Sequence, residues 1–431
     1  MRILQVNTIY GAKSTGRTCA ELERAMTAMG HECYTAYGHG PRAESPFTYR
    51  INTAPEYYFH NLMSRLTGLE GYFSWFATRR LIRYTQVADP DVIHLRNLHG
   101  HYIHLPMFFR FLKRCGKPVV LHLHDCWIFT GKCAHYTERQ CFAWRDGCGH
   151  CPALREYPVS WVFDHSSMMR RDKERWLTSL NNLTVIGVSD WVCDEARKSF
   201  LSGHEILRVY NWVDRDVFRP RLSGFPEQCG IDSSKFIIVS VSAAWSEGSA
   251  RLTDALLLAD LLDDSAQLVL VGHADKPIRH RRIHHVPFVE SIDTLAEMYS
   301  AADIFVHLST EDTFGKVIAE AMACGTPVIV YDSTACGEIP GSECGAVVNP
   351  HDVDEVNAAI CRIRAAGKSK RGVACVNEVE SRFDYSANVN SLIRVYRRMI
   401  WGDIEPNGCV VEGDPLGLTE QDGVDSHAPY Q

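Results

Sequence analysis

Two carboxylates separated by a short polar segment are the residues of this chain best suited to chemistry. Asp312 lies on a loop after the apolar run 304–308, and Glu320 lies in the helix predicted to follow. Between them, Gly315 would let the backbone approach a ligand closely, and the first N–H groups of the helix would bind an anion such as phosphate. Glu320, about one and a half turns into the helix, would reach past the phosphate towards a sugar hydroxyl.

The segment around these carboxylates has the order of a βαβ unit. An apolar strand at 304–308, a glycine-containing loop, a helix, a Gly-Thr-Pro turn and an apolar strand at 327–330 follow one another. Ligands of such units bind at the carboxyl end of the first strand. The simpler alternative is an ordinary βαβ unit whose carboxylates lie in water.

The rest of the chain also alternates apolar strands with helices, which is typical of a doubly wound α/β fold. A strand at 3–7 precedes a polar glycine loop at 10–18 and a helix at 19–29. With 431 residues the chain is longer than the about 250–300 residues at which a single core stops growing, so two domains are expected. Further strands are predicted at 91–95, 118–125, 185–189, 236–242 and 267–272.

The net charge of −7 comes from one end of the chain. Residues 402–431 contain seven acids and no Lys or Arg, which leaves 45 acids and 45 bases elsewhere. This balance does not favour a nucleic-acid-binding protein, which would have a basic excess. The N-terminal residues lack a secretory signal and no run has the length of a membrane span, so we expect a cytoplasmic protein whose 16 cysteines are reduced thiols or metal ligands.

A second polar strand end is predicted at His124 and Asp125. His122 and His124 are two residues apart on one strand and would face the same side, but only His124 reaches the carboxyl end where open α/β sheets bind ligands. We therefore predict His124 in the cleft and His122 in the core or behind the site.

The motifs together resemble a known family. The pattern Asp312-x-Phe314-Gly315, Glu320-Ala-Met-Ala and the Gly-Thr-Pro-Val-Ile run at 325–329 is similar to the donor-site signature of retaining GT-B glycosyltransferases, in particular glycosyltransferase family 4. The family usually has Glu at both carboxylate positions, so Asp312 is a shortened version of the first. Residues 121–131 and 209–220 add weaker similarity, the former to members that assemble exopolysaccharides or colanic acid.

The resemblance implies two Rossmann-like doubly wound domains that face each other across a cleft. Its expected boundaries are an acceptor-side domain at 1–214, a linker at 215–232, a donor-binding domain at 233–384, a helix at 385–401 that returns to the first domain, and a disordered acidic tail at 402–431.

The resemblance also implies transfer of a sugar from a UDP- or GDP-linked donor to an acceptor hydroxyl, with retention and without a catalytic metal. By this analogy His124 faces the donor sugar, Asp312 binds its hydroxyls and Glu320 binds the ribose. The expected donor-binding set is Gly16, Arg251, Phe288, Val289, Thr313, Phe314, Gly315, Lys316 and Glu320.

One departure from the family lies after the first strand of the second domain. Members usually have an Arg and a Lys-Gly there, whose cations hold the diphosphate, but residues 244–251 contain no Lys. Charge-assisted contacts are the strong ones, so Arg251 or Lys316 would have to replace them unless both are surface cations. The missing Lys motivates one alternative hypothesis, a non-catalytic nucleotide-sugar-binding subunit. A nucleotide-sugar epimerase is a second alternative, which the Asp312-x-Phe314-Gly315 arrangement disfavours.

A loop at 131–152 has a different kind of pattern. Cys133, Cys141, Cys148 and Cys151 have the spacing Cys-x7-Cys-x6-Cys-x2-Cys, which suits a tetrahedral structural zinc ion. Two disulfides and four free thiols are the alternatives.

Aromatic residues stand next to arginines at 72–84 and 107–114. Such segments can rest in a membrane interface and hold a lipid-linked glycan acceptor, which predicts peripheral contact with the inner face of the cell membrane. Two ordinary helices packed on the sheet are the alternative.

Overall fold

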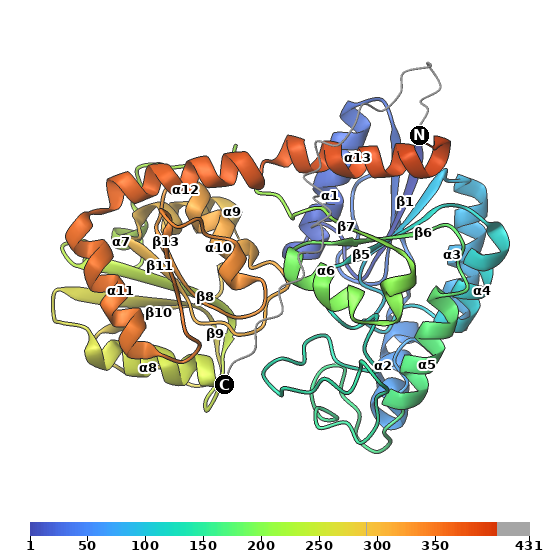
Figure 1. Cartoon of the computed structure of the whole chain (residues 1–431), viewed down its shortest axis with the longest axis horizontal. Coiled ribbons are helices and arrows are strands. Elements are labelled where there is room, and N and C mark those ends of the chain that lie inside the picture. The colour runs from blue at the N-terminus through green and yellow to red at the C-terminus, as the bar shows by residue number, and fades with distance from the viewer. Residues whose placement is uncertain (290, 403–431) are drawn as a thin grey trace, which may run out of the picture.

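The computed structural model describes residues 1–289 and 291–402 of the chain. They form two α/β domains side by side, each built on a parallel sheet (Figure 1). This architecture confirms the predicted pair of doubly wound domains.

The first domain has a seven-stranded sheet with the order β3-β2-β1-β4-β5-β6-β7. Every neighbouring pair in it is parallel. Its strands are β1 (Arg2–Asn7), β2 (Glu32–Tyr37), β3 (Thr48–Arg50), β4 (Val92–Leu95), β5 (Val119–Leu123), β6 (Leu183–Gly187) and β7 (Glu205–Arg208). Its helices are α1 (Lys13–Ala28), α2 (Ala54–Thr67), α3 (Trp75–Ala88), α4 (Leu105–Cys115), α5 (Ser166–Leu177) and α6 (Asp190–Arg197).

The second domain has a six-stranded parallel sheet with the order β10-β9-β8-β11-β12-β13. Its strands are β8 (Phe236–Trp245), β9 (Ala266–Ala274), β10 (Ile283–Val286), β11 (Ile304–His307), β12 (Val328–Tyr331) and β13 (Gly345–Val348). Its helices are α7 (Phe225–Gln228), α8 (Ala250–Leu261), α9 (Ile292–Ala301), α10 (Lys316–Ala323), α11 (Val353–Ala366) and α12 (Lys368–Arg382).

In each sheet the order in which the chain adds strands reverses at a single point. In the first domain the chain builds outwards from β1 to β3 and then restarts at β4 on the other side of β1. In the second domain β8 and β11 have the same relation. Ligands of doubly wound sheets bind at the carboxyl ends of the strands beside such switch points, so a ligand is expected beside the residues that follow β1, β4, β8 and β11.

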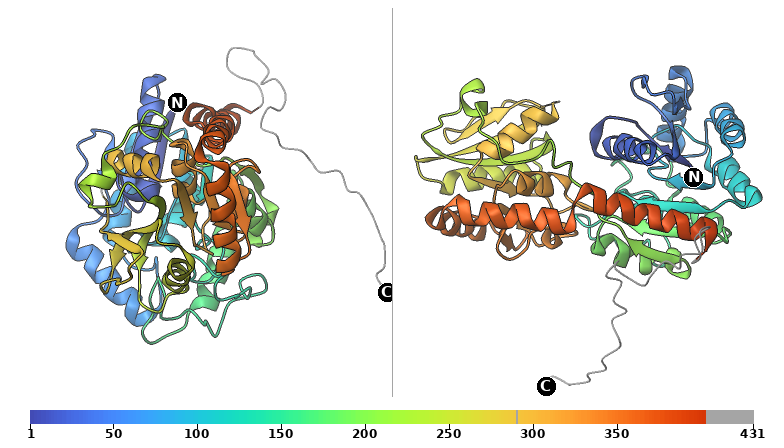
Figure 2. Two further views of the ribbon diagram at one scale, coloured as in Figure 1. Left: turned by 90° about the vertical axis from the view of Figure 1, so that its left-hand side faces the viewer. Right: turned by 90° about the horizontal axis from the view of Figure 1, so that it is seen from above.

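The last described helix, α13 (Tyr385–Trp401), leaves the second domain and lies along the first (Figures 1 and 2). Leu392 and Tyr396 pack there in one core cluster with Ile3 and Val120 of the first sheet. The second domain is thus anchored to the first by a buried apolar contact as well as by the chain crossing near Val213. The predicted tail lies outside the described residues, except for Gly402.

The first helix begins earlier than predicted. Residues 13–18 were expected in a loop, but α1 starts at Lys13, two residues after Gly11, whose φ of +71° makes the turn. A single glycine inside a helix costs only about 1 kcal/mol, and packing of the buried face outweighs it. Gly16 therefore lies in the first turn of a helix.

Among the described residues, no helix has the length and apolar character needed to cross a membrane.

Candidate active site

The loop after β11 ends in a left-handed glycine that opens α10. Gly315 has a φ of +73°, in the left-handed region, and precedes the helix as its N-cap. A Cβ atom at this position would lie 2.7 Å from Cδ1 of Ile318. The left-handed φ favours glycine, and a larger residue would also have to displace the end of the Ile318 side chain. The first N–H groups of a helix have no intrahelical partner, so this end of α10 can bind an anion, as predicted from the sequence.

Asp312 is held in its charged form by a histidine that the sequence analysis did not select. Nε2 of His307 lies 2.8 Å from Oδ2 of Asp312. Burial raises the pKa of Asp312, but the hydrogen bond and the charge of His307 outweigh burial and leave the pKa below its usual value. The backbone N–H of Asp312 donates to Oγ1 of Thr334 at 3.0 Å, which fixes the loop.

Glu320 lies in a buried cluster of charges between the domains. Nη2 of Arg17, on α1, lies 2.7 Å from Oε1 of Glu320, which is 1% exposed. Nζ of Lys316 lies 3.7 Å from Oε2 of Glu21, also on α1. Burial lowers the pKa of Lys316, and its Nζ has no hydrogen-bond partner among the described residues. Two acids and two bases from α1 and α10 thus form one contact.

His124 lies directly after β5 and faces this contact from the first domain. Its carbonyl oxygen accepts a hydrogen bond of 2.7 Å from Oγ1 of Thr313, on the loop between β11 and α10. Nη1 of Arg96 lies 3.2 Å from Nε2 of His124 and also donates to Oγ1 of Thr18 at 2.9 Å. Burial, and then the charge of Arg96, lowers the pKa of His124 well below its usual value, so the imidazole is neutral. A guanidinium only donates hydrogen bonds, so Nε2 is the acceptor and Nδ1 holds the proton.

Arg251 spans the switch point of the second domain. Its guanidinium donates to Oγ of Ser242 on β8 at 2.5 Å and to Oγ of Ser309 after β11 at 2.7 Å. Its Nε donates to the carbonyl oxygen of Leu308 at 3.3 Å. Arg251 is therefore at the predicted place, but its guanidinium is already bonded to the protein.

The remaining predicted donor residues differ in their surroundings. Phe288 is 61% exposed and Val289 is partly buried, so this segment offers a surface after β10. Phe314 is 2% exposed and packs against Tyr210 and Phe383, so its contact with a ligand would come from its backbone. The carbonyl of Gly16 accepts from the N–H of Gly11 at 2.9 Å.

His122, by contrast, lies in the core of the first domain. Its Nδ1 lies 3.2 Å from Nε2 of His94, and it is 2% exposed.

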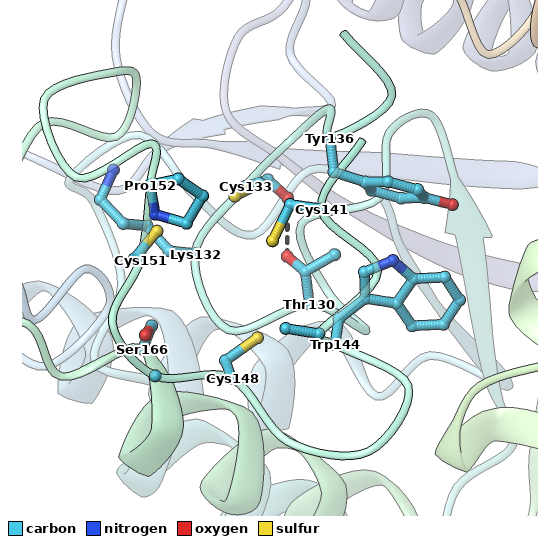
Figure 3. Close-up of a pocket in the computed structure, with 12 residues that line it drawn as sticks. Thr130, Lys132, Cys133, Tyr136, Cys141, Trp144, Cys148, Cys151, Pro152 and Ser166 are labelled. Atoms are coloured by element: carbon cyan, nitrogen blue, oxygen red, sulfur yellow. Dashed lines mark hydrogen bonds between the residues drawn. The ribbon is translucent and has the colours of Figure 1, made fainter. Parts of the chain in front are cut away.

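The four cysteines of the loop at 131–152 line one small pocket (Figure 3). All four are unpaired thiols. The backbone N–H of Gly131 donates to Sγ of Cys148 at 3.2 Å. A Cβ atom on Gly131 would lie 2.9 Å from that sulfur, so only glycine permits this approach.

Four site residues were missed by the sequence analysis, namely Arg17, Glu21, Arg96 and His307. Arg96 follows β4 and His307 ends β11. A polar residue at the carboxyl end of a strand is the signal that selected His124, and it could have found both of these residues too. Arg17 and Glu21 are four residues apart and share one face of α1, but no local pattern shows that this face meets α10.

Comparison with known proteins gives a consistent result for both domains. Residues 15–217 match the family model described as Glycosyltransferase Family 4, and residues 235–365 match the model described as Glycosyl transferases group 1.

The relatives cover most or half of the chain. A protein of Escherichia coli (strain K12) named as a colanic acid biosynthesis glycosyl transferase, WcaC, is 24% identical over 371 residues, which are 82% of this chain and 88% of the relative. A phosphatidyl-myo-inositol mannosyltransferase of Mycobacterium tuberculosis (strain ATCC 25618 / H37Rv) is 29% identical over 210 residues, 45% of this chain and 54% of the relative.

Solved structures share the fold. The sucrose-phosphate synthase of Thermosynechococcus elongatus has a TM-score of 0.63 at 18% identity, covering 93% of this chain and 99% of that one. Anabaena HepE in complex with UDP has a TM-score of 0.58 at 15% identity, covering 92% and 99%. Since the two family models lie on the two domains in order, the chain belongs to the GT-B glycosyltransferases of family 4.

Proposed function

We propose that the protein transfers a sugar from a nucleotide-sugar to an acceptor hydroxyl with retention of the anomeric configuration. The observation that carries this proposal is the meeting of the carboxyl edges of the two sheets at the start of α10. Thr313 bonds to the carbonyl of His124, and Glu320 bonds to Arg17. An anion-binding helix end, a charged Asp312 and a neutral histidine therefore lie around one interdomain contact.

In the proposed mechanism the protein stabilises the leaving diphosphate. The N–H groups that open α10 would bind one phosphate, and Arg251 and Lys316 are the cations nearest to it in the second domain. Charge that develops on the departing oxygen is stabilised by donors already in place, which is commonly the largest contribution to catalysis. Phe288 and Val289 would border the base.

The sugar would lie between Asp312 and His124. Because His307 keeps Asp312 ionised, its free lone pairs would accept hydrogen bonds from sugar hydroxyls. His124 would stand near the anomeric carbon with its proton on Nδ1. Glu320 would accept from the ribose, and since Arg17 already occupies Oε1, the ribose would bind the other oxygen.

A screen of UDP- and GDP-sugars tests this proposal. Slow hydrolysis of one donor, and a glycoside with the donor's anomeric configuration in its NMR spectrum, are expected. UDP is the first choice, since HepE was solved with it. An isomerised sugar from the donor alone would indicate the epimerase. Nucleotide binding by calorimetry, without turnover on any acceptor, would indicate the non-catalytic binding subunit. That alternative is favoured by Arg251, whose guanidinium is already hydrogen-bonded to the protein.

We propose that the acceptor is a glycan or lipid-linked glycan of cell-surface polysaccharide synthesis, used at the inner face of the cell membrane. The similarity to WcaC supports the glycan. Membrane contact is supported by the exposed side chains of Tyr58, Phe59 and Leu62 on α2. Trp161, whose ring lies 5.6 Å from the Arg65 guanidinium, extends the same surface. Apolar residues beside cations bind anionic interfaces.

Sedimentation with vesicles tests the membrane contact. The protein should pellet with anionic vesicles more than with zwitterionic ones, and a Phe59→Ser variant should pellet less. If wild type and variant sediment equally with both kinds of vesicle, a glycan acceptor without a lipid is the better proposal.

We also propose that the cysteine loop holds a structural zinc ion that takes no part in transfer. Four thiolates close the tetrahedral coordination of zinc and leave no open position for a substrate.

A further inference from the structure

The cysteine loop of the first domain touches the donor-side loop of the second. Oγ1 of Thr137 and the backbone N–H of Glu138 donate to Oε1 of Glu311, at 2.9 and 2.7 Å. In return, Oγ1 of Thr310 donates to Oε1 of Glu138 at 3.1 Å. We call these three hydrogen bonds the clasp. Glu311 directly precedes Asp312, so the clasp holds the loop that carries the proposed sugar-binding carboxylate.

The clasp also forms a wall of a cavity between the domains. The cavity has a volume of about 380 Å³ and is lined by residues 137–140 of the cysteine loop, and by Thr310, Ser333 and His351 of the second domain. A change in the position of the cysteine loop therefore changes both the support of Asp312 and the width of an interdomain cavity.

The clasp residues stand between two of the four cysteines. Thr137 and Glu138 lie in the segment from Cys133 to Cys141, and Cys148 and Cys151 complete the wall of a pocket of about 20 Å³ (Figure 3). That volume is close to the space that one water-sized sphere needs, so the pocket has room for a single ion. The volume of the pocket, the spacing of the four cysteines in the sequence and thiolate chemistry suit one zinc ion.

Protein hydrogen bonds fix the base of the loop. Nζ of Lys132 donates to the carbonyl oxygens of Ala153 and Glu156 at 3.1 and 2.7 Å. Nζ of Lys173 donates to Trp127 and Thr130 in the same way, at 2.6 and 3.1 Å. The segment that carries the clasp is held at its centre by side chains: the Tyr136 hydroxyl donates to Glu195, and Nε of Arg139 donates to Oε1 of Glu156 at 2.7 Å. Residues 124–165 contain neither helix nor strand, so contacts of this kind are what hold the loop in place.

The four sulfurs would have to come closer to bind one ion. Among the described residues, two groups of three side chains hold their ligand atoms within 4.8 Å of one another, and neither group contains these cysteines. Zinc binds sulfur at about 2.3 Å in a tetrahedron. Binding would thus contract the pocket and fix both ends of the clasp segment.

We propose that a zinc ion bound by Cys133, Cys141, Cys148 and Cys151 locks the clasp, so that metal occupancy controls the contact between the cysteine loop and the donor-side loop. The metal and the contact rest on the residues described here. The consequence for transfer rests in addition on the proposed function of Asp312.

Metal analysis tests the first part without any assay of transfer. Protein purified from zinc-supplemented medium should hold one zinc ion per chain, and Cys148→Ser should hold almost none. Cys361→Ser is the matched control, because Cys361 is exposed on α11, far from the loop in sequence, and should leave the zinc content unchanged. Metal-free wild type, or a loss of mass from disulfide formation in the intact chain, would overturn the zinc site.

Hydrogen exchange tests the second part. Chelation of the wild type should increase deuterium uptake in two segments, 134–142 and 308–313, and added zinc should reverse the increase. Glu311→Ala should retain its zinc and show high uptake at 308–313 that chelation no longer changes, because the clasp is already broken. Chelation serves where Cys148→Ser fails to fold.

The outcomes separate the two proposals. If chelation changes uptake only at 134–142, zinc is bound but does not lock the clasp, and this inference is wrong. If both segments respond and no donor is turned over, the clasp stands and the proposed transfer fails.

Discussion

Each domain has a His–Asp pair at the carboxyl edge of its sheet. The two pairs differ in how far the carboxylate oxygens are already used by hydrogen bonds within the protein. In the first domain Asp125 lies 2.7 Å from Nε2 of His99 and also accepts from Asn97 at 2.6 Å and from the N–H of Trp127 at 2.9 Å. In the second, Oδ2 of Asp312 lies 2.8 Å from Nε2 of His307, and the Cys336 thiol lies 3.9 Å from the same oxygen. The side chain of Asp312 is 33% exposed and that of Asp125 is 13% exposed.

The arginines show the opposite difference. Arg251 in the second domain uses Nε and both terminal nitrogens on protein acceptors. Arg96 in the first domain is 3% exposed, and its Nε and Nη2 have no hydrogen-bond partner among the described residues. The first domain thus has a saturated carboxylate and an arginine with spare donors, and the second has the reverse. In the proposed site the carboxylate for the ligand therefore belongs to the second domain, and Arg96 of the first domain would act through His124, so the proposed activity would depend on the contact between the domains.

Asp312→Asn should have the largest effect. Removing the charge that would accept from the sugar should lower kcat/KM about 100-fold, the cost of losing one preorganised polar group in an active site. The melting temperature should change little, because Asn can still accept from His307. Asp264→Asn, at an exposed carboxylate of the same domain, is the matched control. Undiminished transfer would place the sugar elsewhere.

Arg96→Gln should have the second largest effect. The variant removes the donor that sets the tautomer of His124, so transfer should fall about 30-fold, as expected for hydrogen bonds to a charged group. The loss should appear in kcat more than in KM for the donor, and Arg96→Lys should restore part of it. Arg42→Gln, at an exposed arginine of the same domain, should behave as wild type. A lower melting temperature with unchanged kcat would show that Arg96 has a structural role alone.

Asp125→Asn should reduce stability and its dependence on pH. Burial raises the pKa of Asp125, but His99 and the N–H of Trp127 lower it from 3.8 to about 2. A carboxyl whose pKa is lower in the folded state stabilises the fold above its unfolded pKa, and this contribution is lost as the pH falls from about 4 towards 2.

The expected loss is about 2 kcal/mol of unfolding free energy at pH 7. Denaturant titrations at pH 7, 4 and 3 should show wild type and variant converging as the acid protonates Asp125. A constant difference between the two would mean that the carboxylate charge does not contribute.

The sequence allowed the donor-side βαβ unit to be predicted almost residue for residue. Its strands were expected at 304–308 and 327–330, and β11 and β12 occupy Ile304–His307 and Val328–Tyr331. Apolar runs bounded by Gly315 and a Gly-Thr-Pro turn are local signals, so a single segment contains them all. The early start of α1 was missed because Gly16 and the polar residues around it have weak helix propensity, which packing overrides.

The site was predictable only as far as each residue could be judged alone. His124 and Asp312 were selected from their places at strand ends, and the structure brings their loops together through Thr313. The bond between Arg17 and Glu320 joins residues 303 positions apart. No periodicity connects such positions, so the interdomain charges required the three-dimensional structure.

Gly315→Ala should have the smallest effect. Its two expected causes are the left-handed backbone and the contact of the new Cβ atom with Ile318, and an alanine variant of Gly116 in the first domain tests the first cause alone. Gly315 and Gly116 have φ values of +73° and +65°, and a Cβ atom on Gly116 would meet nothing within 4 Å. The left-handed backbone should cost each alanine variant about 1 kcal/mol. Gly315→Ala should lose more, because its Cβ would lie 2.7 Å from Ile318, and the displaced N–H groups of α10 should weaken calorimetric UDP binding. Equal losses in both variants, with UDP binding unchanged, would show that this end of α10 tolerates a side chain and does not hold the phosphate.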